Sequence, residues 1–178
     1  MKFFKSSFFY IFSNFNGTDH DITVLTHEAG HALANIYSEN VDPIYKSSII
    51  PTGRALGYVM PLPVKDRIIK RKNQFEDELV VAVAARISEE IVFGAENVAS
   101  GAVSDIQQAT AMARQMVTRY GMSPVGPIAF EDATNNQVFL DGTQPNNNTM
   151  TLDTTSKIDK EVQEIVNYCY QQARAILS

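Results

Sequence analysis

The segment "VLTHEAGHAL", residues 24–33, places two histidines four residues apart, with a glutamate directly after the first. Residues four apart lie on one face of an α-helix, so His27 and His31 can present ring nitrogens to a single metal ion. Zinc takes such nitrogens as ligands and lowers the pKa of a bound water to about 7. Glu28 lies about 100° further round the helix, where it can accept the proton of that water. The segment predicts a hydrolytic zinc site; the alternative is an ordinary helix that carries polar residues.

A catalytic zinc site usually has three protein ligands, and the two histidines leave the third open. His20, the remaining histidine, lies just before the expected helix and is predicted to lie on the surface. A carboxylate must then complete the site, and the candidates are Glu89 or Glu90 in one helical segment and Asp105 in another. On position alone, Asp105 is better explained as an acid in the first turn of a helix.

The elements that must position these residues are mainly helical. Apolar residues recur at helical spacing in four segments, and two short β-type segments, "YKSSIIP" and "ALGYVMP", are joined by a turn at "PTGR". The expected helices start at Asp21 or Thr23 and end near Tyr37, span 74–93, run from an N-cap at Ser104 to Gly121, and start at Asp153. Short strands are also expected at 128–130 and 138–140. The predicted fold class is mainly α with a small β element (α+β).

Composition limits the other classes of function. A chain of 178 residues is long enough for one domain with a core, and its net charge of −5 gives no overall basic field for nucleic acid. Cys169 is the single cysteine, which excludes an internal disulfide and a thiolate-rich zinc cluster. A cytoplasmic or membrane-associated location facing a reducing compartment is expected.

The sequence divides into an aromatic leader, residues 1–20, and one domain, residues 21–178. The leader "MKFFKSSFFYIFSNFNG" has an apolar run that is too short to span a bilayer. Its role is open: it fits a surface anchor, the remnant of a membrane-proximal segment, or an element packed on the core.

Five blocks of this sequence carry a family resemblance: "THEAGHAL", "IIPTGRALGY", "AARISEEIVFG", "SGAVSDIQQATAMARQMVTRYGMS" and "VFLDG". In this order they resemble the peptidase domain of FtsH-type ATP-dependent zinc proteases, over residues 21–177. The resemblance implies a helical fold like that domain and one zinc ion per chain, held by His27, His31 and Asp105. It implies Glu28 as the catalytic base and a homo-oligomer, specifically a hexameric ring.

Two further roles follow from the resemblance. Glu89 is a candidate to orient a ligand histidine, although an exposed glutamate is an equal alternative. The family's strand beside the active-site cleft corresponds to Gly53, Arg54, Ala55, Leu56 and Gly57, whose exposed edge can pair with an extended polypeptide. The alternative is a structural edge strand.

The sequence also departs from the family. Full-length members carry an AAA ATPase module and transmembrane helices, but none of the nine glycines here is followed by lysine, so the chain has no phosphate-binding loop of that type. The sequence leaves open an excised domain, a naturally short homologue or half of a split system. The family's "GGR" is replaced by residues 84–86, "AAR".

The predicted reaction is zinc-dependent hydrolysis of internal peptide bonds in unfolded or membrane-associated proteins. One alternative is a zinc peptidase of another clan that uses Glu89 or Glu90 as the third ligand. The other is a non-proteolytic binding or regulatory module with a structural zinc. Glu28 argues against that module, because a structural site needs no base.

Overall fold

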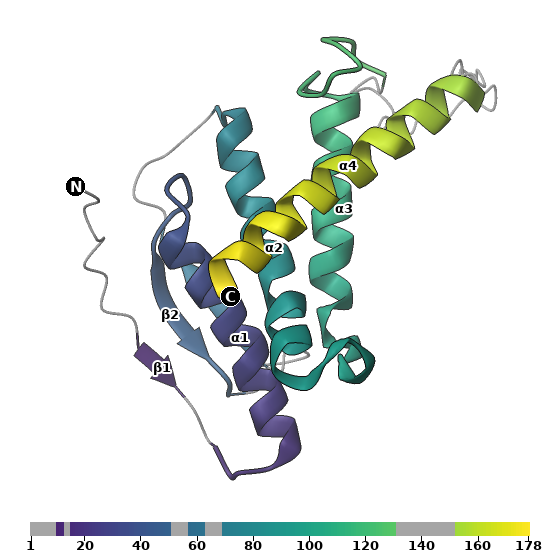
Figure 1. Ribbon diagram of the computed structural model, residues 1–178. Coiled ribbons are helices and arrows are strands. Elements are labelled where there is room, and N and C mark those ends of the chain that lie inside the picture. The colour runs from purple at the N-terminus through teal and green to yellow at the C-terminus, as the bar shows by residue number, and fades with distance from the viewer. Residues whose placement is uncertain (1–9, 13–14, 51–56, 63–68, 131–151) are drawn as a thin grey trace, which may run out of the picture.

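The computed structural model describes residues 10–12, 15–50, 57–62, 69–130 and 152–178 (Figure 1). Their regular elements are β1 Tyr10–Phe12, α1 Asp19–Tyr37, β2 Ile44–Ser48, β3 Tyr58–Pro61, α2 Lys72–Phe93, α3 Val103–Thr118 and α4 Leu152–Leu177, with 3₁₀ turns at Ala95–Asn97 and Ser100–Ala102. The prediction of a mainly α fold with a small β element is confirmed. None of the helices within these ranges is both long and apolar enough to cross a membrane.

Helix α1 begins earlier than Asp21 or Thr23, where the sequence placed its cap. Thr18 is the N-cap: its hydroxyl accepts a hydrogen bond from the Asp21 N–H at 3.1 Å, and the Asp21 carboxylate accepts one from the Thr18 N–H at 3.2 Å. This reciprocal pair satisfies N–H groups that the first turn leaves free. Asp21 therefore acts from inside the helix, and the predicted start was wrong by a few residues.

Helix α3 begins without the predicted cap at Ser104. The 3₁₀ turn at Ser100–Ala102 leads directly into Val103, so Ser104 lies inside the helix and no side chain caps its start. Asp105 consequently lies in the first turn, as the sequence indicated. Helix α2 starts at Lys72, two residues before the expected Gln74, whose side chain accepts a hydrogen bond from the Arg71 N–H at 2.8 Å.

The loop after α3 does not contain the strand expected at 128–130. Instead, the Phe130 N–H donates to the Thr118 carbonyl at 2.8 Å, so this backbone pairs with the end of α3 rather than with a sheet. The second expected strand, at 138–140, and the expected turn at "PTGR" lie outside the described residues.

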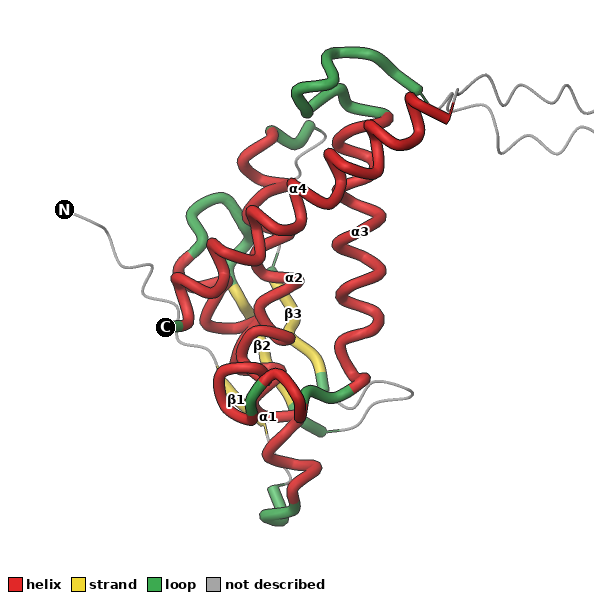
Figure 2. Tube along the Cα trace, turned by 45° about the vertical axis from the view of Figure 1, so that its right-hand side comes forward, coloured by secondary structure: helices red, strands yellow, loops and turns green. Residues whose placement is uncertain are grey.

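A three-stranded sheet lies against α1, in the order β1-β2-β3. Strand β1, which falls in the aromatic leader, runs parallel to β2 with Tyr10 opposite Lys46, and β3 runs antiparallel to β2 with Tyr58 opposite Ser48. Helix α1 contacts β2 and β3 on one side and α2 on the other (Figures 1 and 2). Helix α1 is therefore the layer between the sheet and the rest of the helices.

The apolar core lies between α2, α3 and α4. Its fully buried members include Leu79, Ile87, Ala109, Ala113, Met116, Ile158, Cys169 and Ala173. Burial raises the pKa of the Cys169 thiol to about 12, so this side chain packs as a small apolar residue. Ile91, near the end of α2, is 43% exposed.

Helices α1 and α2 pack closely where a glycine faces a serine. A Cβ on Gly30 would lie 2.4 Å from the Ser88 hydroxyl oxygen and 2.7 Å from the Ala84 carbonyl oxygen. Ser88 donates to the Thr26 carbonyl at 2.8 Å, which links the two helices. Glycine is needed at position 30 for space, and the close approach brings the histidine-bearing face of α1 next to α2.

Candidate metal centre

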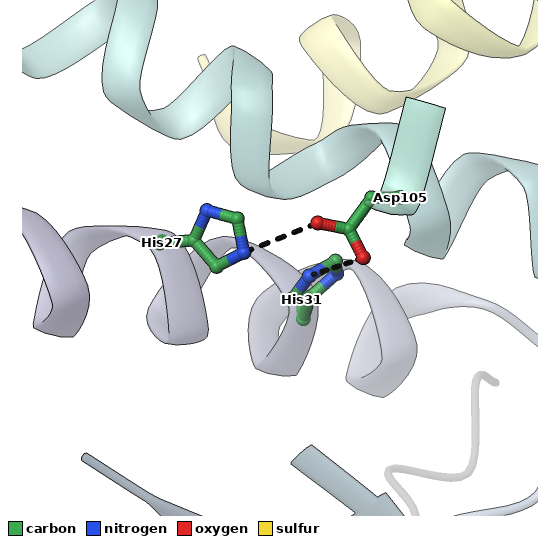
Figure 3. Close-up of side chains that lie close together, drawn as sticks. All are labelled: His27, His31 and Asp105. Atoms are coloured by element: carbon green, nitrogen blue, oxygen red, sulfur yellow. Dashed lines mark ion pairs between the residues drawn. The ribbon is translucent and has the colours of Figure 1, made fainter. Parts of the chain in front are cut away.

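The two histidines of α1 and the aspartate at the start of α3 converge on one point (Figure 3). His27 Nε2 lies 3.2 Å from Asp105 Oδ2, and His31 Nε2 lies 3.7 Å from Asp105 Oδ1. One potential ligand atom from each of the three residues lies within 4.8 Å of the others. The three side chains are partly buried, since each shows 13–21% of its area to solvent. The two histidines of α1 and the first-turn carboxylate of α3 thus lie close together in space.

Both imidazole rings have a hydrogen-bond partner on Nδ1. His27 Nδ1 lies 2.8 Å from Glu89 Oε1, and His31 Nδ1 lies 2.8 Å from the Val81 carbonyl oxygen. A backbone carbonyl only accepts hydrogen bonds, and Glu89 accepts through a carboxylate oxygen, so each Nδ1 carries a proton. In both rings, Nε2 is the nitrogen that faces Asp105. A metal-ligating histidine usually has such a partner on its second nitrogen.

Glu89 links three elements through one carboxylate. Its Oε1 accepts from His27, and its Oε2 accepts from the Ala99 N–H at 2.9 Å, in the segment that leads to α3. The side chain is 1% exposed, so the alternative of a surface glutamate is wrong. Both of its oxygens have partners, and this arrangement fixes the His27 ring relative to Asp105.

Glu90 points to a different part of the molecule. Its carboxylate accepts hydrogen bonds from the Tyr170 hydroxyl and from the guanidinium groups of Arg86 and Arg174. These contacts join α2 to α4. In the alternative that takes Glu89 or Glu90 as the third ligand, either carboxylate would have to give up these partners.

The close charges shift the ionisation of His27 and Asp105 in opposite directions. Burial alone would lower the pKa of His27, but its hydrogen bonds to Asp105 and Glu89 outweigh burial and raise the pKa to about 9. Burial alone would raise the pKa of Asp105, but its hydrogen bonds to His27 and His31 hold the pKa well below the ordinary 3.8. Without a metal ion, the cluster is thus stabilised by its own ion pairs.

Glu28 lies beside this cluster and is almost completely buried, with 5% of its surface exposed. Its Oε2 atom has no hydrogen-bond partner among the described residues. Burial raises the pKa of the carboxyl group above the ordinary 4.5, and the nearby His31 and His27 act against that rise. A buried oxygen without a partner is costly in a purely structural role.

The donor set fits zinc. Two imidazole nitrogens and one carboxylate oxygen are borderline-soft and hard ligands of the kinds that zinc accepts, and a catalytic site commonly has three protein ligands with one further position open. The unpartnered Glu28 oxygen beside the set is consistent with a group that meets a water or substrate there.

Comparison with known proteins shows the family of this chain. The family model for peptidase family M41 matches residues 18–178. This chain belongs to peptidase family M41. The M41 chain is 43% identical over 152 residues to the ATP-dependent zinc metalloprotease FtsH of Cyanidium caldarium, covering 85% of this chain and 25% of that relative.

Two other relatives show the same partial coverage. The FtsH of Rickettsia bellii is 46% identical over 154 residues, covering 85% of this chain and 24% of the relative. The mitochondrial inner membrane m-AAA protease component yta12 of Schizosaccharomyces pombe is 42% identical over 156 residues, covering 87% of this chain and 19% of the relative. The M41 chain therefore spans a quarter or less of these relatives, and the resemblance to the FtsH-type family is confirmed.

Some site residues of the M41 domain could not be placed from sequence. The Val81 carbonyl and the Ala99 N–H are backbone groups, which carry no signal in a residue pattern. Of the predicted substrate strand, Gly53, Arg54, Ala55 and Leu56 lie outside the described residues. Gly57 is described, directly before β3, and it lies against Glu28.

Proposed function

We propose that this domain is a zinc-dependent endopeptidase, in which His27, His31 and Asp105 hold the ion and Glu28 is the general base. One observation carries the proposal: the Nε2 atoms of the two histidines and the Asp105 carboxylate meet beside a buried carboxylate, Glu28, that has an unpartnered oxygen. A structural zinc site would not need that carboxylate, so the observation favours an enzyme over a binding module.

Each residue of the site has a separate role in the proposed hydrolysis. Zinc, when bound, acts as a Lewis acid toward the scissile carbonyl and makes water more acidic. Glu28 takes a proton from the attacking water and passes it to the leaving amine nitrogen. Its burial supports this role, because a carboxyl group with a raised pKa is closer to the working pH for both proton transfers. Glu89 and the Val81 carbonyl hold the two rings in place.

The names of the relatives and the position of β3 support a proposal for the substrate class. The relatives are named ATP-dependent zinc metalloproteases. We propose unfolded or membrane-associated polypeptides as substrates, delivered by an AAA ATPase module to a hexamer of these domains. Strand β3, which begins directly after Gly57, is at the edge of the described sheet, and this supports pairing of an extended substrate backbone with that edge. We also propose that the domain is cytoplasmic or membrane-associated and faces a reducing compartment.

The test compares the wild-type domain with Glu28→Gln on an unfolded polypeptide such as casein, with zinc content measured in both. We expect cleavage at internal bonds by the wild type and a loss of about 10²–10⁴-fold in kcat for the variant, because a positioned general base contributes that much. Zinc content stays equal. If the zinc-loaded wild type cleaves nothing even as an oligomer, the non-proteolytic module is the better description.

A further inference from the structure

Gly57 and Glu28 are in closer contact than a side chain at position 57 would allow. A Cβ built on Gly57 would lie 2.5 Å from Glu28 Oε1, 2.8 Å from Cγ and 2.9 Å from Cδ. Non-bonded carbon atoms are normally about 3.5–4.0 Å apart. The backbone just before β3 therefore covers the Glu28 carboxylate directly.

Backbone conformation does not explain the glycine. The glycines in the left-handed region within the described residues are Gly17, Gly94, Gly121 and Gly126, and Gly57 is not among them. An alanine could adopt the backbone of position 57 without strain. Only the space taken by Glu28 requires that the residue lack a side chain.

The obstruction at Gly57 differs in kind from the one at Gly30. The atoms nearest to Gly57 all belong to the Glu28 side chain, whereas those nearest to Gly30 include the Ala84 carbonyl oxygen and the Ala85 Cα. A side chain can rotate away at modest cost, but backbone cannot. An added methyl group at position 57 would therefore leave the fold in place and move the carboxylate.

We infer that Gly57 is a positioning residue for Glu28: its bare backbone forms the wall that holds the buried carboxylate beside the His27–His31–Asp105 cluster. The inference rests on the proposed function for its effect on catalysis. The wall explains why Glu28 is 5% exposed although it adjoins a site that must admit substrate. Gly57 would then position the Glu28 carboxylate, whether or not the neighbouring strand edge pairs with the substrate backbone.

The catalytic test is Gly57→Ala in the zinc-loaded protein. We expect kcat to fall by about 100-fold, since misplacing a reacting group by about 1 Å can cost that much, while KM and zinc content stay at wild-type values. The matched control is Gly101→Ala, because a Cβ there meets nothing within 4 Å and Gly101 is not in the left-handed region. An unchanged kcat in Gly57→Ala, or a rise in KM without a fall in kcat, overturns the inference.

A second readout does not depend on activity. Thermal midpoints are compared for Gly57→Ala in the wild-type background and in the Glu28→Ala background, which lacks all three atoms that the new Cβ would meet. We expect a fall of about 2–4 °C in the first background, from a displaced rotamer, and none in the second. If Gly57→Ala does not fold in the wild-type background but folds in the Glu28→Ala background, the contact is equally supported. Equal falls in both backgrounds overturn it.

The two readouts separate the inference from the proposed function. A wild-type protein that binds zinc but cleaves no polypeptide would contradict the proposed function, whereas the four midpoints would still show whether Gly57 and Glu28 interact. If the wild type is active, Gly57→Ala keeps the wild-type kcat, and the changes in thermal midpoint from Gly57→Ala and Glu28→Ala simply add, the role of Gly57 is contradicted. The proposed function would then still stand.

Discussion

Helix α2 meets its two sets of neighbours in different ways. Toward α1 it offers Ser88, Glu89 and the Val81 carbonyl, which make hydrogen bonds of 2.8 Å to specific atoms. Toward α3 and α4 it offers apolar side chains such as Leu79 and Ile87, which are fully buried. Apolar burial is non-directional and holds helices together, while hydrogen bonds have strict geometry and orient individual rings. Substitutions on the two faces should therefore have separable effects, on the metal site and on stability.

The largest expected effect on the metal side comes from Asp105→Asn. Removing the charge removes the carboxylate ligand, so zinc affinity should fall by more than the roughly 100-fold that loss of a supporting residue causes. Zinc content after dialysis and a competitive chelator titration measure this. The control is Asp159→Asn, an exposed aspartate paired with Arg114, which should bind zinc as the wild type does. Full zinc content in Asp105→Asn would show that the third ligand lies elsewhere.

On the apolar face, Leu79→Ala should be the most damaging change to stability. Leu79 has no exposed surface, and a buried leucine truncated to alanine costs about 2–5 kcal/mol through lost burial and the cavity left behind. Urea unfolding of the metal-free protein measures this loss. The paired control is Leu33→Ala at a half-exposed position on α1, with a cost of about 0.5 kcal/mol. The folded Leu79→Ala protein should keep its zinc affinity, and a large loss of affinity would mean that the two faces are not separable.

A smaller effect is expected from Glu89→Gln. The amide cannot accept from both His27 and the Ala99 N–H, so one of them loses its partner and the His27 ring is less well held. Zinc affinity should fall by about 10–100-fold. Its neighbour Glu90→Gln is the matched control, because Glu90 contacts α4 and not the histidines. Similar zinc affinities for the two variants would refute the role of Glu89.

The smallest effect is the pH dependence of the metal-free protein. His27 has a pKa raised from 6.5 to about 9, so the folded state binds its proton more tightly than the unfolded state. This contribution to stability is fully present below pH 6.5 and is lost as the pH rises toward 9. Unfolding free energies across that range should fall in the wild type and in Leu79→Ala alike, and should fall less in His27→Gln. A flat profile in the wild type would mean that the ion pairs do not form without metal.

Sequence reasoning named the three residues that converge, because their chemistry is tied to residue type and spacing. The separation of His27 and His31 matches a helical turn, and Asp105 was placed in a first turn, where α3 has it. The convergence of α1 and α3 could not be derived from spacing, because two strands and helix α2 lie between these elements in the chain. The family resemblance supplied it. The local spacing rules gave the candidates but not their contact.

The errors at element ends have physical causes. The start of α1 was missed because Thr18 and Asp21 share the capping, and the sequence offers several acceptable caps in a row. Ser104 resembles a cap, but the 3₁₀ turn before it already supplies the entry into α3. The contact between Gly57 and Glu28 joins residues far apart in the sequence, and a glycine alone does not indicate what its missing side chain makes room for.

The close approach of α1 to α2 at Gly30 limits how this domain can evolve. The obstacles to a larger residue include backbone atoms of positions 84 and 85, and these atoms are present whatever side chains stand there. No compensating substitution on α2 could restore the space, so a change at Gly30 would have to be accommodated by moving one helix, with His27 and His31 on it, away from the other. Any residue other than glycine at this position would clash with the main chain of α2 unless the helices moved apart.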